Sequence, residues 1–285
     1  MLDTVLILGK GFLGTAISSV AMNLGIHSIA LPRSGNGVDI TNIGSIERVI
    51  QETNPSLIIN CAACTHIDEI ERNPREAYEI NAYGAKNVAL VAQKHEIKHI
   101  HISTDSVFDG KKGMYTETDI PNPINEYTKS KKLGEDMVKE VSESSIILRT
   151  NFYGFHEQGK QLFNWVLENL QNNKIMTGFV DVIFNPLEVK NLATMIIELG
   201  SSEFCGIIHL TSDEIMSKYE FAVKIADILG YDSNLVEKGK IVDRKYLAKR
   251  PLNTTLCNTM AKRILKTNQI SLQEWLKNNE KSFTR

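Results

Sequence analysis

The sequence has few cysteines, no long apolar run and almost no net charge, and each shortage excludes a class of protein. Its four cysteines (Cys61, Cys64, Cys205 and Cys257) do not form the framework of a small disulfide-bonded domain. No apolar run reaches the roughly 18 residues that a helix needs to span a bilayer. The formal net charge of −2 gives no strong field to attract nucleic acid or an anionic membrane. No charged leader precedes the first apolar run, so we expect a reduced, cytoplasmic protein without nucleic-acid or membrane partners.

The first half of the chain alternates short apolar runs with longer amphipathic segments. The apolar runs are Val5–Leu8, Ser28–Leu31, Leu57–Cys61, His99–Ser103 and Ile146–Arg149. The amphipathic segments are Leu13–Leu24, Ser45–Thr53, Pro74–His95 and Asn125–Val141. Continuous apolar runs suit strands buried on both faces, so the alternation predicts an α/β domain of the Rossmann type, a doubly wound parallel sheet, over residues 1–150. Ligands of such sheets bind beyond the carboxyl ends of the strands.

The second half predicts a smaller C-terminal α/β lobe over residues 151–285. Helices are expected at Gln161–Asn172, Leu187–Leu199, Lys218–Leu229 and Leu272–Lys281, with a strand near Ile207–Leu210. Part of residues 180–210 is expected to complete the first domain. The sequence has no linker rich in Pro, Gly or Ser and no internal repeat, so the lobe is predicted to pack directly on the first domain.

The first predicted strand leads into a G-x-G-x-x-G motif that opens a helix. Glycines in this position permit a tight turn and let backbone N–H groups approach a pyrophosphate at the positive end of the helix dipole. The motif predicts dinucleotide binding by Gly9, Lys10, Gly11, Phe12, Leu13 and Gly14.

A basic residue follows the second predicted strand, where NAD-selective sites carry an acidic residue that binds the ribose hydroxyl. Arg33 stands there, and Lys10 lies in the glycine loop. Two cations suit the 2′-phosphate of NADP, so NADP(H) is expected to be preferred over NAD(H). The competing interpretation is a surface turn with basic residues.

Small residues follow the third predicted strand, where Ala62, Ala63 and Cys64 would let an extended cofactor lie across the strand ends. Cys61 and Cys64 also form a C-x-x-C followed by His66, a pattern found in redox pairs and zinc sites. Further ligands or redox features are not evident in the sequence. We therefore interpret these cysteines as small buried thiols and predict no metal site.

The catalytic candidates are a phenol, an ammonium and a hydroxyl. Tyr127 and Lys131 are four residues apart in a predicted helix, which places them on one face. A cation beside a phenol lowers its pKa towards the range useful for acid–base catalysis. Thr104, after the fourth strand, is placed to bind a substrate carbonyl, with Asp105 beside it. The alternatives are a solvated helix face and capping of a turn by Ser, Thr and Asp.

Seven motifs follow one another along the chain in an order that resembles a known superfamily. They are GKGFLG at 9–14, RSGNGVDIT at 33–41, NCAACTHIDEIE at 60–71, ISTDSVFDG at 102–110, YTKSKKLGE at 127–135, ILRTNFYG at 147–154 and KRPLNTTL at 249–256. Together they resemble the extended short-chain dehydrogenases/reductases, and within these the dTDP-4-dehydrorhamnose reductases and their sugar-nucleotide relatives.

The resemblance implies a catalytic role for each of three residues. Tyr127 would protonate the carbonyl oxygen as hydride arrives from the nicotinamide. Lys131 would hold the cofactor ribose and lower the pKa of the tyrosine, and Thr104 would polarise the carbonyl. The implied cofactor contacts include Gly11, Phe12, Leu13, Asp39, Ile40, Ala62, Ala63 and Cys64.

The substrate side departs from the family pattern. The expected substrate residues are Thr104, Asp105, Ser106, Phe152 and Arg250. Ser106 stands where the family commonly has an aromatic residue, and Asn151-Phe152 stand where rhamnose-pathway members tend to have Ser-Trp. These changes bear on the identity of the sugar rather than on cofactor binding.

The expected function is NAD(P)H-dependent reduction of the 4-keto group of a nucleotide-linked deoxysugar in surface polysaccharide synthesis. Members of the family that the chain resembles are often dimers, so the resemblance also implies a homodimer. Two alternatives stay open: an epimerase or dehydratase of nucleotide-sugars, and a non-catalytic NADP-binding subunit resembling the regulatory subunit of methionine adenosyltransferase.

Overall fold

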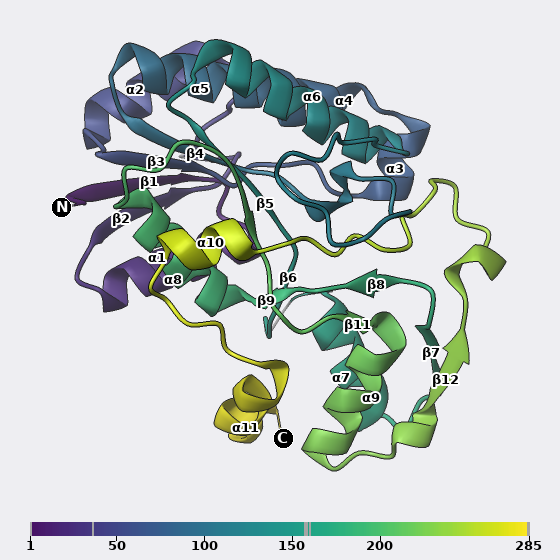
Figure 1. The fold of residues 1–285 in the computed structure, drawn as a ribbon. Helices are drawn as coiled ribbons and strands as arrows, with labels where there is room; N and C mark the ends of the chain where they lie inside the picture. The colour runs from purple at the N-terminus through teal and green to yellow at the C-terminus, as the bar shows by residue number, and fades with distance from the viewer. Residues whose placement is uncertain (1, 36, 157–158, 160, 284–285) are drawn as a thin grey trace.

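A central parallel sheet organises the first half of the protein. The computed structural model describes residues 2–35, 37–156, 159 and 161–283, so Asn36 of the RSGNGVDIT motif lies outside the described residues. In these residues a six-stranded sheet has the order β2-β1-β3-β4-β5-β10, and every neighbouring pair is parallel (Figure 1). Its strands are β1 Thr4–Leu8, β2 His27–Leu31, β3 Leu57–Asn60, β4 Lys98–Ile102, β5 Ile146–Thr150 and β10 Gly206–Leu210. The predicted Rossmann-type fold is confirmed.

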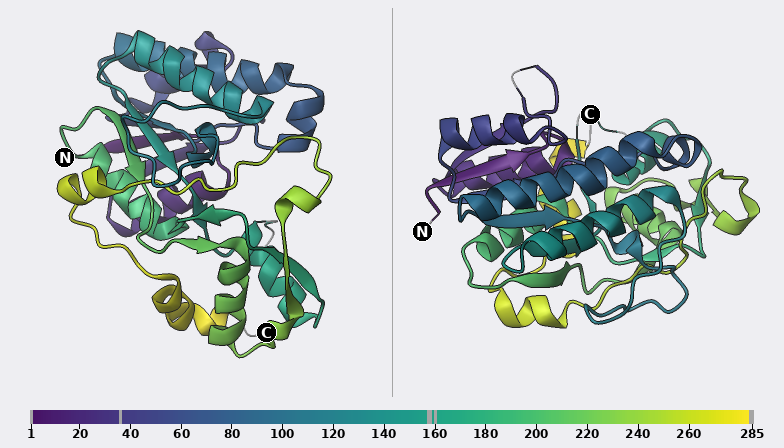
Figure 2. Two further views of the ribbon diagram at one scale, coloured as in Figure 1. Left: turned by 45° about the vertical axis from the view of Figure 1, so that its right-hand side comes forward. Right: turned by 90° about the horizontal axis from the view of Figure 1, so that it is seen from above.

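Helices cover both faces of this sheet. Helices α2, α5 and α6 pack side by side on one face, and α1 packs against α8 on the other (Figures 1 and 2). The helices of the chain are α1 Phe12–Asn23, α2 Ile43–Thr53, α3 Ile67–Arg72, α4 Arg75–Tyr78, α5 Ala85–Lys94, α6 Glu126–Val141, α7 Leu162–Gln171, α8 Val189–Gly200, α9 Lys218–Leu229, α10 Thr259–Ile264 and α11 Leu272–Phe283. The longer predicted helices are present, each within a few residues of the expected bounds. The short α3 and α10 were not predicted, because six residues carry too little periodicity.

A π-helical turn interrupts the helix that was predicted over Pro74–His95. The turn, η1, spans Glu79–Gly84 and joins α4 to α5. It buries Asn81, whose amide bonds both the N–H and the C=O of Cys64 and also the Ser130 hydroxyl, at 2.8–3.0 Å. Gly134 permits α6 to approach this turn, because a Cβ at that position would lie 2.1 Å from the Asn81 carbonyl oxygen. The turn therefore connects the end of β3 to the helix that carries Tyr127.

The second lobe has its own apolar core and consists mostly of short elements. Its small strands are β6 Phe152–Tyr153, β7 Met176–Phe179, β8 Ile183–Phe184, β9 Leu187–Glu188, β11 Met216–Ser217 and β12 Val236–Gly239. Phe163, Phe221 and Trp275 meet in this core, whereas Leu192 and Ile196 of α8 pack in the core beneath the sheet. We propose that the first domain includes α8 and β10 besides residues 1–150. The remainder of 151–285 then forms the smaller lobe.

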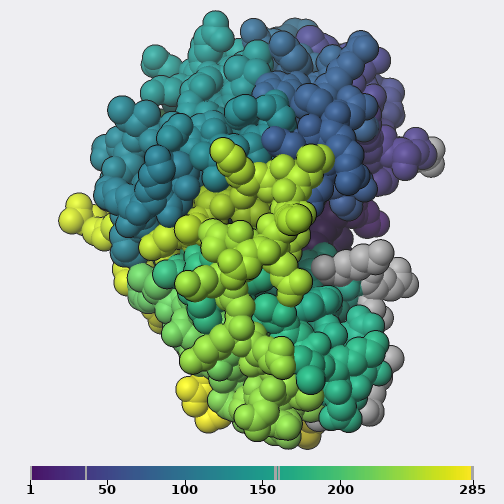
Figure 3. All heavy atoms as spheres, turned by 90° about the vertical axis from the view of Figure 1, so that its right-hand side faces the viewer, coloured from purple at the N-terminus to yellow at the C-terminus, as the bar shows by residue number. Residues whose placement is uncertain are grey.

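A long segment without regular helix or strand, apart from one short 3-10 turn, runs from the second lobe back to the first domain. We call residues 240–252 the strap. At one end the Asp181 carboxylate accepts from the Ile241 N–H at 2.8 Å. At the other end Arg250 pairs with Asp68 of α3 at 3.1 Å, and Asn125 donates to the Lys249 carbonyl at 2.8 Å. Figure 3 shows this yellow-green segment lying across the boundary between the blue first domain and the green second lobe.

One fully buried ion pair fixes α6 against the sheet. Arg149 of β5 binds both carboxylate oxygens of Glu135 on α6, at 2.7 and 3.0 Å, and both side chains are 2% exposed. Ser103, the residue before Thr104, donates its hydroxyl to the same carboxylate at 2.5 Å. The Phe108 ring covers the guanidinium at 5.1 Å. The pair thus determines how α6, with Tyr127, sits relative to the end of β4.

Replacing Arg149 with methionine should lower the free energy of unfolding by about 3–5 kcal/mol, because it leaves the Glu135 carboxylate buried without its partner. Urea denaturation measures the change. The double variant Arg149→Met/Glu135→Leu should recover much of the loss, since no charge then stays buried. Arg48→Met is the control, because Arg48 pairs with Glu52 at the surface with half of its side chain exposed and such pairs contribute less than about 1 kcal/mol. Equal effects of Arg149→Met and Arg48→Met would contradict the importance of the buried pair.

Candidate functional site

The predicted site residues come together at the carboxyl edge of the sheet. Leu8, Leu31 and Asn60 lie opposite one another in the register of β1, β2 and β3, so the residues that follow them share one edge. Gly9 turns the chain there with φ of +103°. A Cβ on Gly9 would lie 2.7 Å from the Ala62 nitrogen, so glycine is needed for both its conformation and its size. The strand order reverses direction at β1, which is the point where such sheets bind nucleotides.

A cavity of about 410 Å³ lies over this edge. The predicted cofactor residues that line it are Gly9, Lys10, Gly11, Arg33, Ile40, Ala62, Ala63 and Cys64. Leu13 and Gly14 are buried in the first turn of α1 beneath it. The Phe12 ring packs instead against Phe152 and His156 of the second lobe, with centroids 5.9 and 5.6 Å away. The Asp39 carboxylate accepts from both the N–H and the hydroxyl of Thr41, and so shapes the loop beside the cavity.

The N-terminus of α1 is built for an anion. Gly11 is its N-cap and offers no side-chain acceptor to the first-turn N–H groups, and the first turn contains no acidic residue. Four N–H groups at a helix start lack intrahelical partners, and the helix dipole is positive there. The pyrophosphate of a dinucleotide fits this arrangement.

Arg33 has an acidic partner that the sequence did not reveal. Its guanidinium contacts the Glu76 carboxylate at 2.5 Å, and both side chains are more than half exposed and line the first cavity. The hydrogen bond that Arg33 donates to Glu76 raises the pKa of Arg33. A cofactor 2′-phosphate would therefore compete with Glu76 for the guanidinium.

The cysteines beside the cavity are free thiols and do not form a disulfide. Burial raises the pKa of Cys61 to about 12, and burial together with the charge of Glu76 raises the pKa of Cys64. Both thiols are therefore protonated at neutral pH and are poor nucleophiles. Among the described residues, no three His, Cys, Asp or Glu side chains are placed to hold a metal ion.

Tyr127 and Lys131 both lie at the start of α6, but their electrostatics differ from the prediction. Burial, and then the charge of Asp105, raise the pKa of Tyr127 to about 12, while a hydrogen bond with Thr104 lowers it. Lys131 is 2% exposed and donates its ammonium to the Ile102 carbonyl at 2.7 Å. Burial lowers the pKa of Lys131 to about 8. The expectation that Lys131 lowers the phenol pKa is wrong for the protein by itself, because burial and a nearby carboxylate raise this pKa while the ammonium is turned to the Ile102 carbonyl. Tyr127 is a neutral phenol at pH 7, and so a proton donor.

Asp105 connects Thr104, the predicted catalytic hydroxyl, to the second lobe. It is 2% exposed. One carboxylate oxygen accepts from the hydroxyls of Thr104 and Ser106, each at 3.0 Å. The other accepts from Asn151 at 2.7 Å and Thr254 at 2.6 Å. In this structure the carboxylate of Asp105 is occupied by these four protein donors, one of which is Thr104. The expected contact of Asp105 with the substrate stays a prediction.

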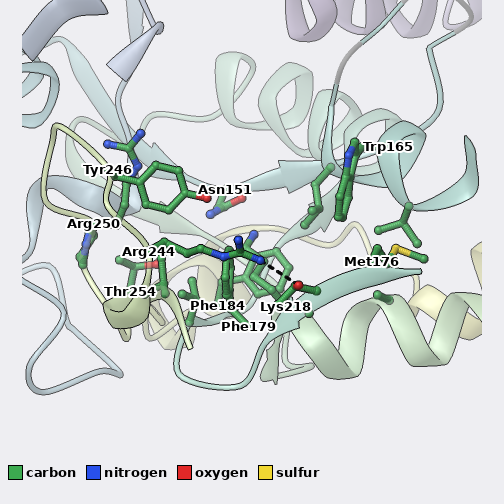
Figure 4. A pocket seen from close by; sticks show the side chains of 18 of the residues that line it. Asn151, Trp165, Met176, Phe179, Phe184, Lys218, Arg244, Tyr246, Arg250 and Thr254 are labelled. Atoms are coloured by element: carbon green, nitrogen blue, oxygen red, sulfur yellow. Dashed lines mark hydrogen bonds between the residues drawn. The ribbon is translucent and has the colours of Figure 1, made fainter. Parts of the chain in front are cut away.

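A larger cavity of about 930 Å³ opens beside Asp105, between the second lobe and the strap. Ser106 and Arg250, both predicted substrate residues, line it, as do Asn151 and Thr254. Arg244 of the strap reaches across to the Thr177 hydroxyl at 2.9 Å (Figure 4). Phe152 packs on Phe12 rather than lining this cavity.

Several residues of the larger cavity carry no sequence signal. Trp165 and Tyr246 line it with 43% and 45% of their surface exposed, and Lys218 lines it from the start of α9. These residues come from α7, the strap and α9, which only the fold brings together. A pattern of residues near in sequence could not have revealed them.

Comparison with known proteins decides the family. Residues 3–284 match the family described as the RmlD substrate binding domain. The chain belongs to this family.

Relatives in this family differ in what they do. The chain is 34% identical over 252 residues to the probable low-salt glycan biosynthesis reductase Agl14 of Haloferax volcanii, covering 87% of this chain and 84% of that protein. It is 33% identical over 281 residues to the dTDP-4-dehydrorhamnose reductase of Aggregatibacter actinomycetemcomitans, covering 94% and 95%. It is also 30% identical over 279 residues to methionine adenosyltransferase 2 subunit beta of Bos taurus, covering 88% and 79%.

A solved structure shares the complete fold of this RmlD-family chain. The dTDP-4-dehydrorhamnose reductase (rfbD) of Bacillus anthracis, in complex with NADP, superposes with a TM-score of 0.90. It is 31% identical, and the match covers 98% of both chains. Among the described residues, no helix is long and apolar enough to cross a membrane.

Replacing Asp105 with asparagine should lower the free energy of unfolding by about 1–3 kcal/mol, because an amide NH₂ would then face two of the four donors that now share the carboxylate. Denaturant unfolding measures this change. Asp136→Asn is the control, because Asp136 lies at the surface of α6 with 58% of its side chain exposed and should leave stability unchanged. Unaltered stability of Asp105→Asn would show that Asp105 does not organise these four donors.

Proposed function

We propose that this RmlD-family protein is an NADPH-preferring reductase of the 4-keto group of a nucleotide-linked deoxysugar, acting in glycan synthesis. The observation that carries the proposal is a neutral phenol, Tyr127, whose pKa is influenced by a hydrogen bond with Thr104, by Asp105 beside the larger cavity and by Cys64 of the first cavity. The names of the relatives support it, since they include sugar-nucleotide and glycan reductases.

The first cavity fits a nicotinamide dinucleotide. The N-terminus of α1, with Gly9, Lys10 and Gly11, would hold the pyrophosphate, and Ile40 the adenine side. Arg33 and Lys10 would bind the 2′-phosphate, which makes NADP(H) the preferred cofactor and NAD(H) the weaker one. When bound, NADPH supplies the hydride. The NADP in the solved relative supports this assignment.

The protein's own residues would handle the proton and the carbonyl. Tyr127 holds a proton at its phenol oxygen at neutral pH and would donate it to the substrate oxygen. The Thr104 hydroxyl, which donates to Asp105 in this structure, would turn its proton to the same oxygen when substrate binds. Lys131, with a pKa of about 8, is near the point of losing its charge. A ribose hydroxyl, added to the Ile102 carbonyl, would give its ammonium a second acceptor.

The larger cavity fits a nucleotide-sugar. Its volume of about 930 Å³ is within the size range of pockets that enclose drug-sized ligands. Trp165 and Tyr246 present exposed aromatic faces on which a base can stack. Arg244 and Arg250 bring positive charge for a diphosphate. We propose that Ser106, Phe152 and Asp105 shape the sugar end of the site.

Two finer points belong to the same proposal. We propose a homodimer, which sedimentation equilibrium would measure. We also place the reaction in the cytoplasm, because it consumes NADPH and the protein keeps its cysteines as free thiols.

The regulatory-subunit alternative is favoured by the likeness to methionine adenosyltransferase 2 subunit beta. A binding subunit has no need of a phenol and a hydroxyl set between two cavities. An epimerase or dehydratase would return its cofactor unchanged, so stoichiometric NADPH consumption separates it from a reductase.

The function is tested by NADPH oxidation with dTDP-4-dehydrorhamnose and related 4-keto sugar nucleotides. We expect turnover by the wild type. Tyr127→Phe should lower kcat by about 10²–10⁴-fold, because the proton donor is lost. NADPH affinity, followed by fluorescence titration, should stay nearly unchanged, which shows that the site is intact. Tight NADPH binding by the wild type without turnover of any of these sugars would reject the reductase, and normal turnover by Tyr127→Phe would reject its proton donor.

Cofactor preference should respond in opposite directions to changes at Arg33 and Glu76. Arg33→Asp should shift the ratio of kcat/KM for NADPH and NADH towards NADH by about 10–100-fold, because a charge-assisted bond to the 2′-phosphate is replaced by repulsion. Glu76→Gln should shift the ratio towards NADPH, because it frees the guanidinium. If neither variant changes the ratio, Arg33 is only a surface residue.

A further inference from the structure

Lys218 occupies a position that is unfavourable for a lysine. It is the first residue of α9, directly after the N-cap Ser217, which forms a capping box with Glu220. The positive end of the helix dipole lies there, so a cation in the first turn is destabilised. Neighbouring positions follow the usual rules for a helix start, and Lys218 departs from them.

Among the described residues, the surroundings of Lys218 compensate for this position only in part, through the face of an aromatic ring. Its ammonium lies 3.2 Å from the centroid of the Phe184 ring. Among the described residues it has no hydrogen-bond acceptor and no ion pair, in contrast to Arg244, which binds Thr177, and Arg250, which binds Asp68. Burial lowers the pKa of Lys218 to about 7, and the charge of Asp105 opposes this shift. An aromatic face is not a hydrogen-bond acceptor, so a partly buried ammonium with this contact still costs free energy unless a ligand supplies an acceptor.

The place of Lys218 in the larger cavity is near the catalytic residues. Ser106, Asn151 and Thr254 line the same cavity, and all three bind Asp105, which also holds Thr104. Of the described residues, Asp105 is the charged group that acts on the pKa of Lys218. Lys218 therefore lies at the end of the cavity that is close to Asp105, and Figure 4 shows it with Phe184 among the side chains of this pocket.

We propose that Lys218 is a specificity-determining residue whose ammonium binds an oxyanion of the substrate at this end of the larger cavity. The proposal rests on the proposed function, because it takes the cavity to hold a nucleotide-sugar. The oxyanion has two sources with the same chemistry: the phosphate attached to the sugar, or a carboxylate carried by the sugar itself.

Isothermal titration calorimetry distinguishes these sources without relying on turnover. The NADP-bound wild type, Lys218→Met and Lys218→Arg are titrated with dTDP, dTDP-glucose and dTDP-glucuronate. Lys218→Met should weaken binding by about 10–100-fold, the loss of one charge-assisted hydrogen bond, and Lys218→Arg should stay within a few-fold of the wild type. A loss for all three ligands identifies the phosphate, and a loss for dTDP-glucuronate alone identifies a sugar carboxylate. Unchanged affinity of Lys218→Met for all three overturns the proposal.

Proton uptake gives a readout that a purely structural role would not move. At pH 8 a free amine with a pKa of about 7 is mostly neutral, and an oxyanion favours its charged form. Binding to the wild type should therefore take up a proton, seen as a difference in heat between buffers of different ionisation enthalpy. Lys218→Arg should bind without this uptake, because arginine is always charged. Uptake that persists in Lys218→Arg would assign the proton to another group.

Controls separate this proposal from folding defects and from the proposed function. Lys245→Met removes an exposed cation that lines the same cavity and should change affinity far less than Lys218→Met. Lys218→Met should unfold at the same or a higher temperature, because it removes a desolvated charge from a helix N-terminus.

If the wild type binds these ligands but reduces no keto-sugar, the reductase is rejected while Lys218 keeps its role. If the wild type turns over and Lys218→Met binds equally well, only the role of Lys218 is rejected. Failure of the wild type to bind any of the three ligands overturns both.

Discussion

The buried pair of Arg149 and Glu135 is the constraint on which the geometry of the candidate site depends. Two opposite charges removed from water must satisfy each other closely, so this contact allows little play between β5 and α6. Ser103 joins the same carboxylate one residue before Thr104. The sheet and α6 thereby hold the Thr104 hydroxyl and the Tyr127 phenol, the proposed catalytic groups, in one rigid frame.

A second carboxylate, Asp105, extends this frame into the part that receives the substrate. Its four donors come from the end of β4, the end of β5 and the segment after the strap. Burial leaves Tyr127 protonated and Lys131 and Lys218 easily deprotonated. The same low-dielectric surroundings therefore keep one phenol protonated and bring the pKa of two lysines close to neutral pH. Each of these buried groups lowers the free energy of unfolding somewhat.

Local sequence was enough to predict the parts of the molecule whose patterns are formed by residues close together in the chain. Apolar runs gave the parallel sheet, and the glycine motif and the Tyr-x-x-x-Lys spacing gave the residues at its edge. Features that depend on distant contacts could not be predicted this way. Asp105 meets Thr254 across 149 residues, and Glu76 reaches Arg33 across 43. The direction of the Tyr127 pKa shift was mispredicted for the same reason, because helix spacing places Lys131 nearby without showing that its ammonium turns to Ile102.

The π-helical turn makes the length of the chain matter in one short place. An α-helix rotates by about 100° per residue, so deleting one residue from Glu79–Gly84 would swing the preceding helix around its axis by that amount. Asn81 would then lose alignment with either Cys64 or Ser130. Most surface loops tolerate insertions and deletions, whereas the alignment of Asn81 depends on the exact number of residues in this turn. The loss of a single codon here would break the connection between the end of β3 and α6, although the side chains of the candidate site would all still be present in the sequence.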